Sequence, residues 1–129
     1  MRLRETGAGM RGAEAWASTL GLSKSLTMLD LRGNKVGDLG GAALAEALPH
    51  SVSLISLDLS DNKLALRTAR ALAKALANNR AGLTSLDVSW NHFRPPDARL
   101  LLASLIKNSS LRALNLSWNG IGKDAVSDG

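Results

Sequence analysis

The chain has 129 residues, of which 45% are hydrophobic and 21% charged, and its formal net charge at pH 7 is +5. This length fits one domain with a continuous core, while the absence of cysteine excludes disulfides and thiolate metal sites and suits a reducing compartment. The first residues lack the roughly 7–15 apolar residues of a secretory signal, and no stretch reaches the roughly 20 of a membrane span, so we expect a cytoplasmic or nuclear protein.

The first predicted element is a helix within residues 8–25. Trp16 and Leu20 stand at one and the same step before Leu44 and Leu48 (44 − 16 = 28 and 48 − 20 = 28), so this stretch has the phase of a later helix. We therefore interpret residues 8–25 as the helical half of a repeat whose strand is missing.

The first predicted strand lies in a nine-residue phrase, L-x-x-L-x-L-x-x-N. Residues two apart in a strand share one face, so the last two leucines of the phrase point inward together. The steps between successive asparagines are nearly constant (62 − 34 = 28, 91 − 62 = 29 and 119 − 91 = 28), a period that predicts a solenoid of stacked strands and helices. The phrase occupies residues 26–34, 54–62, 83–91 and 111–119.

The asparagine that closes each phrase comes where the chain leaves its strand. A side-chain amide both donates and accepts, so it can satisfy backbone groups of neighbouring turns that have lost their ladder partners. We interpret the four asparagines as a structural ladder, in preference to a row of ligand-binding amides. They are Asn34, Asn62, Asn91 and Asn119.

Between the phrases the apolar period changes from two to about 3.6, which predicts one buried stripe per helix. Gly37 and Gly40 open the first of these helices, and Pro95-Pro96-Asp97 opens the third. After the fourth phrase, Ile121 begins another repeat, but the chain stops before a helix can form.

The period and its helical half resemble the ribonuclease-inhibitor-like subfamily of leucine-rich repeats. The SWN triplets at 89–91 and 117–119 are similar to leucine-rich repeat-containing protein 74 and its relatives. The resemblance implies an α/β leucine-rich-repeat solenoid, a right-handed βα superhelix with a short parallel sheet on the concave side and helices on the convex side. Ribonuclease inhibitors often alternate Asn with Cys at the ninth position; this chain has no Cys, so ribonuclease binding is not expected.

We expect a single domain, residues 1–129, whose two ends lack the polar caps that solenoids need. We interpret the chain as a fragment of a longer solenoid, which self-associates through its uncapped ends or is marginally stable. Its predicted parts are the helical half-repeat 8–25, the repeats 26–53, 54–82 and 83–110, and a truncated last repeat, 111–129.

The outward residues of the predicted strands form the first candidate site. Their middle column reads Asp30, Asp58, Asp87 and then Asn115. Like charges about 5 Å apart repel, so a carboxylate row invites a cationic partner. The alternative is ordinary usage of hydrated aspartates. We expect no metal or cofactor, because no His or Cys accompanies these acids at ligand spacing.

Trp90 and Trp118 form the second candidate site, because they lie on adjacent turns at the rim of the concave face. Exposed tryptophans beside acids are typical of a protein-binding hot spot. Alternatively, the two pack on each other and, with Phe93, on the loops as a satellite of the core.

Cations gather on the predicted outer side. Arg67, Arg70 and Lys74 follow i, i+3, i+7 spacing on the second helix, and further basic residues lie in the loops and the third helix. Such a face could bind nucleic acid or acidic lipid, or could simply be solvated. The further residues are Arg80, Arg94, Arg99, Lys107 and Arg112.

Catalysis finds no support in this chain. His50 and His92 lie far apart in sequence, on different predicted loops, and belong to no known nucleophile or metal spacing. We therefore expect a non-enzymatic scaffold that binds protein partners through the concave face. The alternatives are an activator of a small GTPase, acting through a loop arginine, and a protein that binds nucleic acid through its basic surface.

Overall fold

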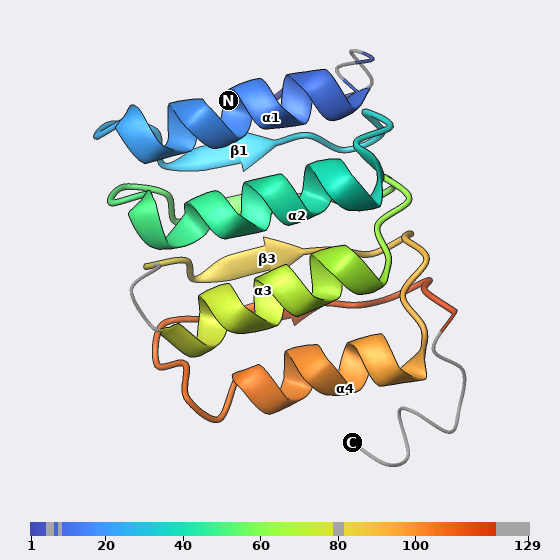
Figure 1. The fold of residues 1–129 in the computed structure, drawn as a ribbon. Coiled ribbons are helices and arrows are strands. Elements are labelled where there is room, and N and C mark those ends of the chain that lie inside the picture. Colours follow the sequence, from blue (N-terminus) through green and yellow to red (C-terminus); the bar gives the residue numbers. More distant parts are fainter. Residues whose placement is uncertain (5–6, 8, 79–81, 121–129) are drawn as a thin grey trace.

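The computed structural model describes residues 1–4, 7, 9–78 and 82–120. Short strands alternate with helices along the chain, and the helices form one layer while the strands form the other (Figure 1). The elements in order are α1 (Gly9–Leu22), β1 (Met28–Asp30), α2 (Gly37–Ala47), the 3-10 helix η1 (Leu48–His50), β2 (Ser56–Asp58), α3 (Leu66–Asn78), β3 (Ser85–Asp87), α4 (Pro95–Ser104) and β4 (Ala113–Asn115).

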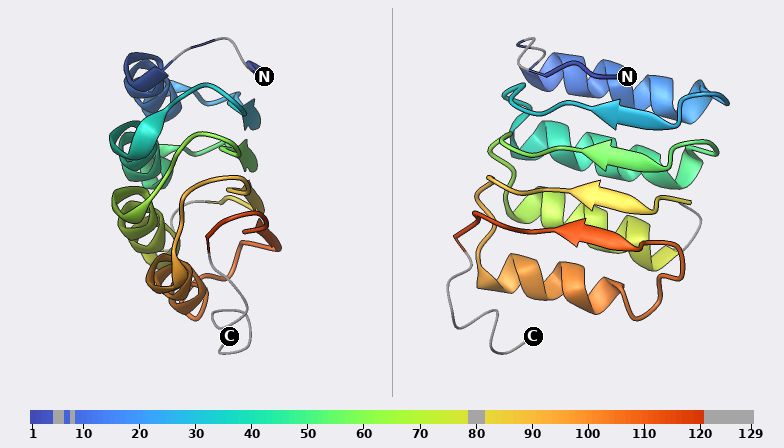
Figure 2. Two further views of the ribbon diagram at one scale, coloured as in Figure 1. Left: turned by 90° about the vertical axis from the view of Figure 1, so that its right-hand side faces the viewer. Right: turned by 180° about the vertical axis from the view of Figure 1, so that it is seen from behind.

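The four strands form one parallel sheet in the order β1-β2-β3-β4. Equivalent leucines pair across it, Leu29 with Leu57, Leu57 with Leu86, and Leu86 with Leu114. The extra residue of the longer repeat therefore falls outside the strands. Seen from the side, helices line one face and strands the other in successive turns (Figure 2). The predicted leucine-rich-repeat solenoid is confirmed.

The core runs between the two layers. The inward strand residues are at most 1% exposed from β1 to β3, and so are the helical leucines Leu44, Leu72 and Leu101. Apolar area of this kind is the main stabilising term of the fold. In the fourth turn the corresponding Leu114 of β4 and Leu116 after it are only partly buried.

The helices begin only partly at the residues that the sequence predicted. Gly37 begins α2 with a φ of +76°, and Pro95 begins α4, where Asp97 Oδ2 accepts the Arg94 N–H at 2.9 Å. The expectation that Gly40 also opens α2 is wrong. Gly40 lies inside the helix, where a Cβ would come within 3.1 Å of the Ala13 Cβ of α1.

Residues 1–4, here called the N-terminal arm, correct the interpretation that the strand before α1 is missing. Arg2 forms a parallel bridge with Asp30, Leu3 N–H donates to the Asp30 carbonyl at 2.7 Å, and Asp30 N–H donates to the Met1 carbonyl at 2.8 Å. The arm thus lies beside β1 in the place of a preceding strand (Figure 2, right). Leu3 stands one full repeat before Leu31, so the repeat phase already begins at the arm.

Part of the prediction lies outside the described residues, namely Arg80, Ile121 and the rest of the segment 121–129. Over the helices that are described, none combines the length and the apolar character needed to cross a bilayer.

Candidate functional site

The strand exits are held together by the asparagines. Asn62 Oδ1 accepts the N–H groups of Asn34 (2.9 Å) and Val36 (3.2 Å), while its Nδ2 donates to the Leu31 carbonyl at 2.9 Å. Asn91 makes the equivalent bonds one turn later, and Asn119 accepts the Phe93 N–H at 3.1 Å. Each amide thus connects its turn to the preceding one and is committed to the backbone.

The aspartates of the middle column use one carboxylate oxygen in the same region. Asp58 Oδ1 accepts both the N–H (2.9 Å) and the Oγ–H (2.6 Å) of Ser60, and Asp87 Oδ1 does the same with Ser89 at 2.9 and 2.6 Å. Asp30 Oδ1 accepts the Arg32 N–H at 3.1 Å. These bonds form a local turn in which the aspartate side chain accepts a hydrogen bond from the backbone N–H two residues later.

Arg4 of the N-terminal arm binds the second oxygen of this column. Its Nε donates to Asp30 Oδ2 at 2.5 Å, and its Nη2 lies 3.8 Å from Asp58 Oδ2. The hydrogen bond to Asp30 and the surrounding aspartates raise the pKa of Arg4 above its ordinary value. Asp30 is only 4% exposed, so the alternative of a fully hydrated aspartate row is wrong at this residue.

Arg4 was not among the residues predicted for the site, although the sequence contains a signal for it. Arg4 stands one full repeat before Arg32 and so occupies the column beside the aspartates. The signal was lost because the first repeat begins only at its last strand residues and lacks the leading leucine of the phrase.

The tryptophans stack on each other at the strand exits. Their ring centroids are 4.8 Å apart at an interplanar angle of 14°, yet Trp90 remains 48% and Trp118 70% exposed. Phe93 is fully buried in the core, whereas both tryptophans keep about half or more of their surface exposed. The structure therefore brings the two residues together but leaves their outer surfaces in solvent.

Both tryptophans adopt the left-handed backbone conformation, with φ of +56° at Trp90 and +59° at Trp118. Gly33 and Asp61 hold the same position in the earlier repeats, with φ of +68° and +54°. Glycine adopts this conformation readily, and aspartate tolerates it better than a bulky side chain does. The tryptophans are therefore backbone outliers in a turn for which smaller residues are better suited.

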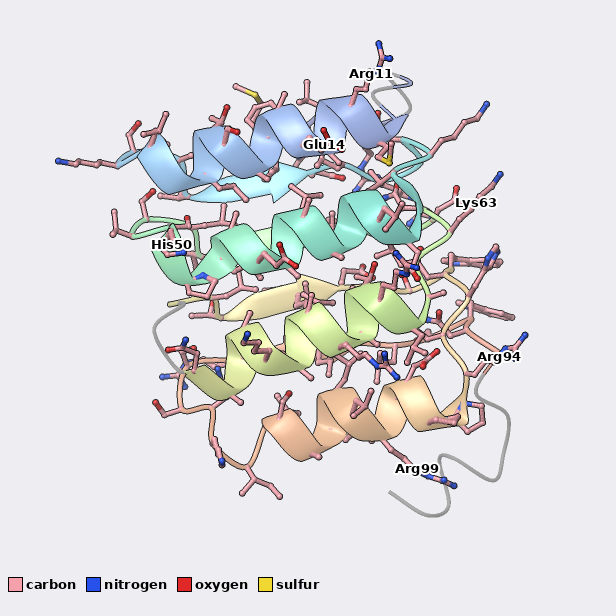
Figure 3. The ribbon with its side chains drawn as sticks, viewed as in Figure 1. Arg11, Glu14, His50, Lys63, Arg94 and Arg99 are labelled. Atoms are coloured by element: carbon pink, nitrogen blue, oxygen red, sulfur yellow. The ribbon has the colours of Figure 1, made fainter. Side chains whose placement is uncertain are left out.

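The opposite face carries the predicted cations. Arg67, Arg70 and Lys74 are exposed on α3. Lys74 also lines a groove of about 340 Å³ that includes Glu46 and His50. Figure 3 shows Lys63 pointing outward from one turn, and Arg94 and Arg99 pointing outward from the next. Among the residues that the structure describes, no group of three or more His, Asp or Glu side chains is placed to hold a metal ion.

Comparison with known proteins supports this repeat geometry. The sequence profile of the Leucine Rich repeat family matches residues 22–45, 50–73, 83–102 and 107–127, which together make up more than half of the chain. The chain belongs to the leucine-rich-repeat family. Its matched segments begin before or at each strand phrase, and the first three extend into the helix that follows the strand.

Solved structures share the fold of this leucine-rich-repeat chain. One of them is a leiomodin-1 structure described as actin-binding site 2, with a TM-score of 0.79 and 17% sequence identity over 92% of this chain and 69% of that one. At this identity the likeness shows the fold alone. No curated protein is significantly similar in sequence.

Proposed function

We propose that this leucine-rich-repeat chain is a non-enzymatic protein-interaction module of the cytoplasm or nucleus. It binds a protein partner through its strand side, using Asp30, Asp58 and Asp87 as a charged stripe and Trp90 with Trp118 as an apolar anchor. The observation that carries the proposal is the stacked tryptophan pair, which stays exposed in an unfavourable backbone conformation.

Energetics favour binding over folding as the role of the pair. A non-glycine residue in the left-handed region costs on the order of 1–3 kcal/mol, and smaller side chains occupy the same turn in the other repeats. The stacked pair leaves 48% of the Trp90 surface and 70% of the Trp118 surface in solvent, so much of the indole surface is not used by the fold. Tryptophan is among the residues that dominate binding energy when a partner covers them.

The proposal is tested by giving each tryptophan position the residue of an earlier repeat. We expect Trp90→Gly and Trp118→Asp to leave the melting temperature unchanged or raised, because Gly33 and Asp61 already hold this conformation. Partner affinity should fall by about tenfold or more, the typical loss at a hot spot. The measurement is titration of a purified partner, identified by proximity labelling, with both variants.

Val52→Ser serves as the matched control, because Val52 is an apolar side chain that is 79% exposed away from the tryptophans. The proposal fails if the tryptophan variants bind the partner as tightly as the Val52 control.

Actin is the first protein to assay, since the leiomodin-1 structure is described as an actin-binding site. Within the family, the SWN triplets alone support a closer kinship with leucine-rich repeat-containing protein 74.

A further inference from the structure

We infer that the outward oxygens of the aspartate row form a site for arginine, and that the partner supplies an arginine-bearing segment in competition with the N-terminal arm. The inference rests on the proposed function, because it names the chemistry of the partner at the same face. Three observations carry it: the unequal use of the two carboxylate oxygens, the position of Arg4, and the neighbouring tryptophans.

The two oxygens of each aspartate have different surroundings. Oδ1 of Asp58 and of Asp87 accepts two bonds from the serine of its own turn. Oδ2 takes no part in these bonds, and in Asp30 and Asp58 it is the atom that Arg4 approaches. The row therefore offers one acceptor per strand, at the strand spacing of about 4.8 Å.

Arg4 shows which chemistry this row accepts. A single guanidinium contacts the carboxylates of two adjacent strands, at 2.5 Å and 3.8 Å, while its side chain remains 55% exposed. A planar guanidinium with several fixed donors suits such a bridge, whereas an ammonium is a point charge. The longer of the two approaches leaves Asp58 only loosely engaged.

The second pair of neighbouring aspartates in the row is Asp58 and Asp87, and a further guanidinium would fit between them. Within the described part of the chain, Asp87 forms no ion pair, and its Oδ2 receives only a long 3.5 Å bond from Asn115 Nδ2. Trp90 follows Asp87 in the same strand exit and is exposed. An arginine stacks on indole rings as well as bridging carboxylates, so a partner arginine at this step can use both.

The experiment uses a short, blocked peptide of alternating glycine and arginine as the probe, with a lysine version beside it. Asp87→Asn removes the charge but retains the Oδ1 acceptor, as native Asn115 does when it accepts the Ser117 N–H at 3.0 Å. We expect a loss of arginine-peptide affinity of about threefold to fivefold, and weaker binding of the lysine peptide. Asp61→Asn, an equal charge change at an exposed aspartate outside the row, is the control.

Arg4→Gln tests the competition. It should strengthen arginine-peptide binding by about threefold, because Asp30 and Asp58 lose their internal cation. Amide exchange of Leu3, whose N–H bonds to the Asp30 carbonyl, should accelerate when the peptide is added to the wild-type chain, since the arm is displaced.

The inference is overturned if Asp87→Asn and Asp61→Asn weaken binding of the arginine peptide equally. That result would mean that the peptide is attracted by the overall negative charge and not by the aspartate row. It is also overturned if Arg4→Gln leaves the affinity for the arginine peptide unchanged and the peptide does not change the exchange of Leu3 in the wild-type chain. Loss of partner binding in the tryptophan variants, with no response in the aspartate variants, would retain a protein-interaction module anchored by the tryptophans and reject the arginine site. Loss in neither set would reject both.

Discussion

Asp38 shows how a single side chain connects two turns of the solenoid. It lies in the first turn of α2, but its Oδ1 accepts the N–H groups of Ala65 (2.9 Å) and Thr68 (2.8 Å), and its Oδ2 accepts that of Arg67 (3.0 Å). These groups are at the start of α3. Burial raises the pKa of Asp38, but the bonds from the α3 backbone outweigh it and hold the pKa below its ordinary value.

Asp38→Ala should lower the free energy of unfolding by about 1–2 kcal/mol near neutral pH, the usual cost of losing a helix cap. Because the folded pKa is lowered, this stabilisation is complete above the unfolded pKa of about 3.9 and is lost as pH falls through the folded value. Urea titrations at pH 7 and pH 3 measure the difference, which should shrink at the lower pH. The exposed Glu14→Ala is the control, and an equal loss at both pH values would contradict the assignment.

At the element scale, two adjacent glycines set the approach of three helices. Gly40 of α2 faces Ala13 and Met10 of α1, while Gly41 faces α3. A Cβ at Gly41 would come within 2.5 Å of Leu64 Cδ2 and closer still to Thr68 Oγ1. The Asp38 cap lies at the same contact, where Thr68 Oγ–H also donates to the Asp38 carbonyl at 2.9 Å.

Gly41→Ala should therefore destabilise the chain by about 1–3 kcal/mol through overpacking, although alanine favours helix by roughly 1 kcal/mol. Gly21→Ala in α1 is the matched control, because its Cβ would meet only the His50 Cβ at an ordinary 4.0 Å. Thermal and urea unfolding of the two variants give the measurement. A Gly41 variant as stable as the Gly21 variant would show that the helices can separate without cost.

The sequence predicted the elements that recur and missed those that occur once. All four strands were found, because the phrase that encodes them repeats and its inward leucines share one physical requirement. Gly41 and the Asp38 cap have no counterpart in the other turns that the structure describes, so periodicity carried no information about them. Arg4 does share the column of Arg32, but the phrase that would have revealed it is incomplete at this repeat. Stacking of Trp90 on Trp118 followed from the period, but their left-handed backbone did not, since tryptophan rarely adopts it.

At the scale of the whole molecule, each turn packs on its sequence neighbours, α1 on α2, α2 on α3 and α3 on α4. Stability in such an array is close to a sum of neighbour terms, and among the helices that the structure describes α4 packs on α3 alone. Leu102 in α4 is 39% exposed, and Ile106, which follows the end of that helix, is 86% exposed. The residue of α2 that corresponds to Leu102, Ala45, is fully buried.

We predict that the isolated chain self-associates through the surface of Leu102 and Ile106 as its concentration rises. Sedimentation velocity over a concentration series measures the association, and Ile106→Lys should shift the species toward monomer because it places a charge in the apolar contact. Val52→Lys, at another exposed apolar residue, should leave the association unchanged. A monomer at every concentration would contradict the prediction.

The spacing of the aspartate column also determines which ligand conformation can match it. Its carboxylates recur from strand to strand at about 4.8 Å. Successive turns of an α-helix advance by about 5.4 Å, whereas same-face residues of an extended chain are about 7 Å apart. The cations of a helical ligand that crosses the strands therefore stay close to the carboxylate spacing over several strands. The cations of an extended ligand no longer match the carboxylates after the first strand.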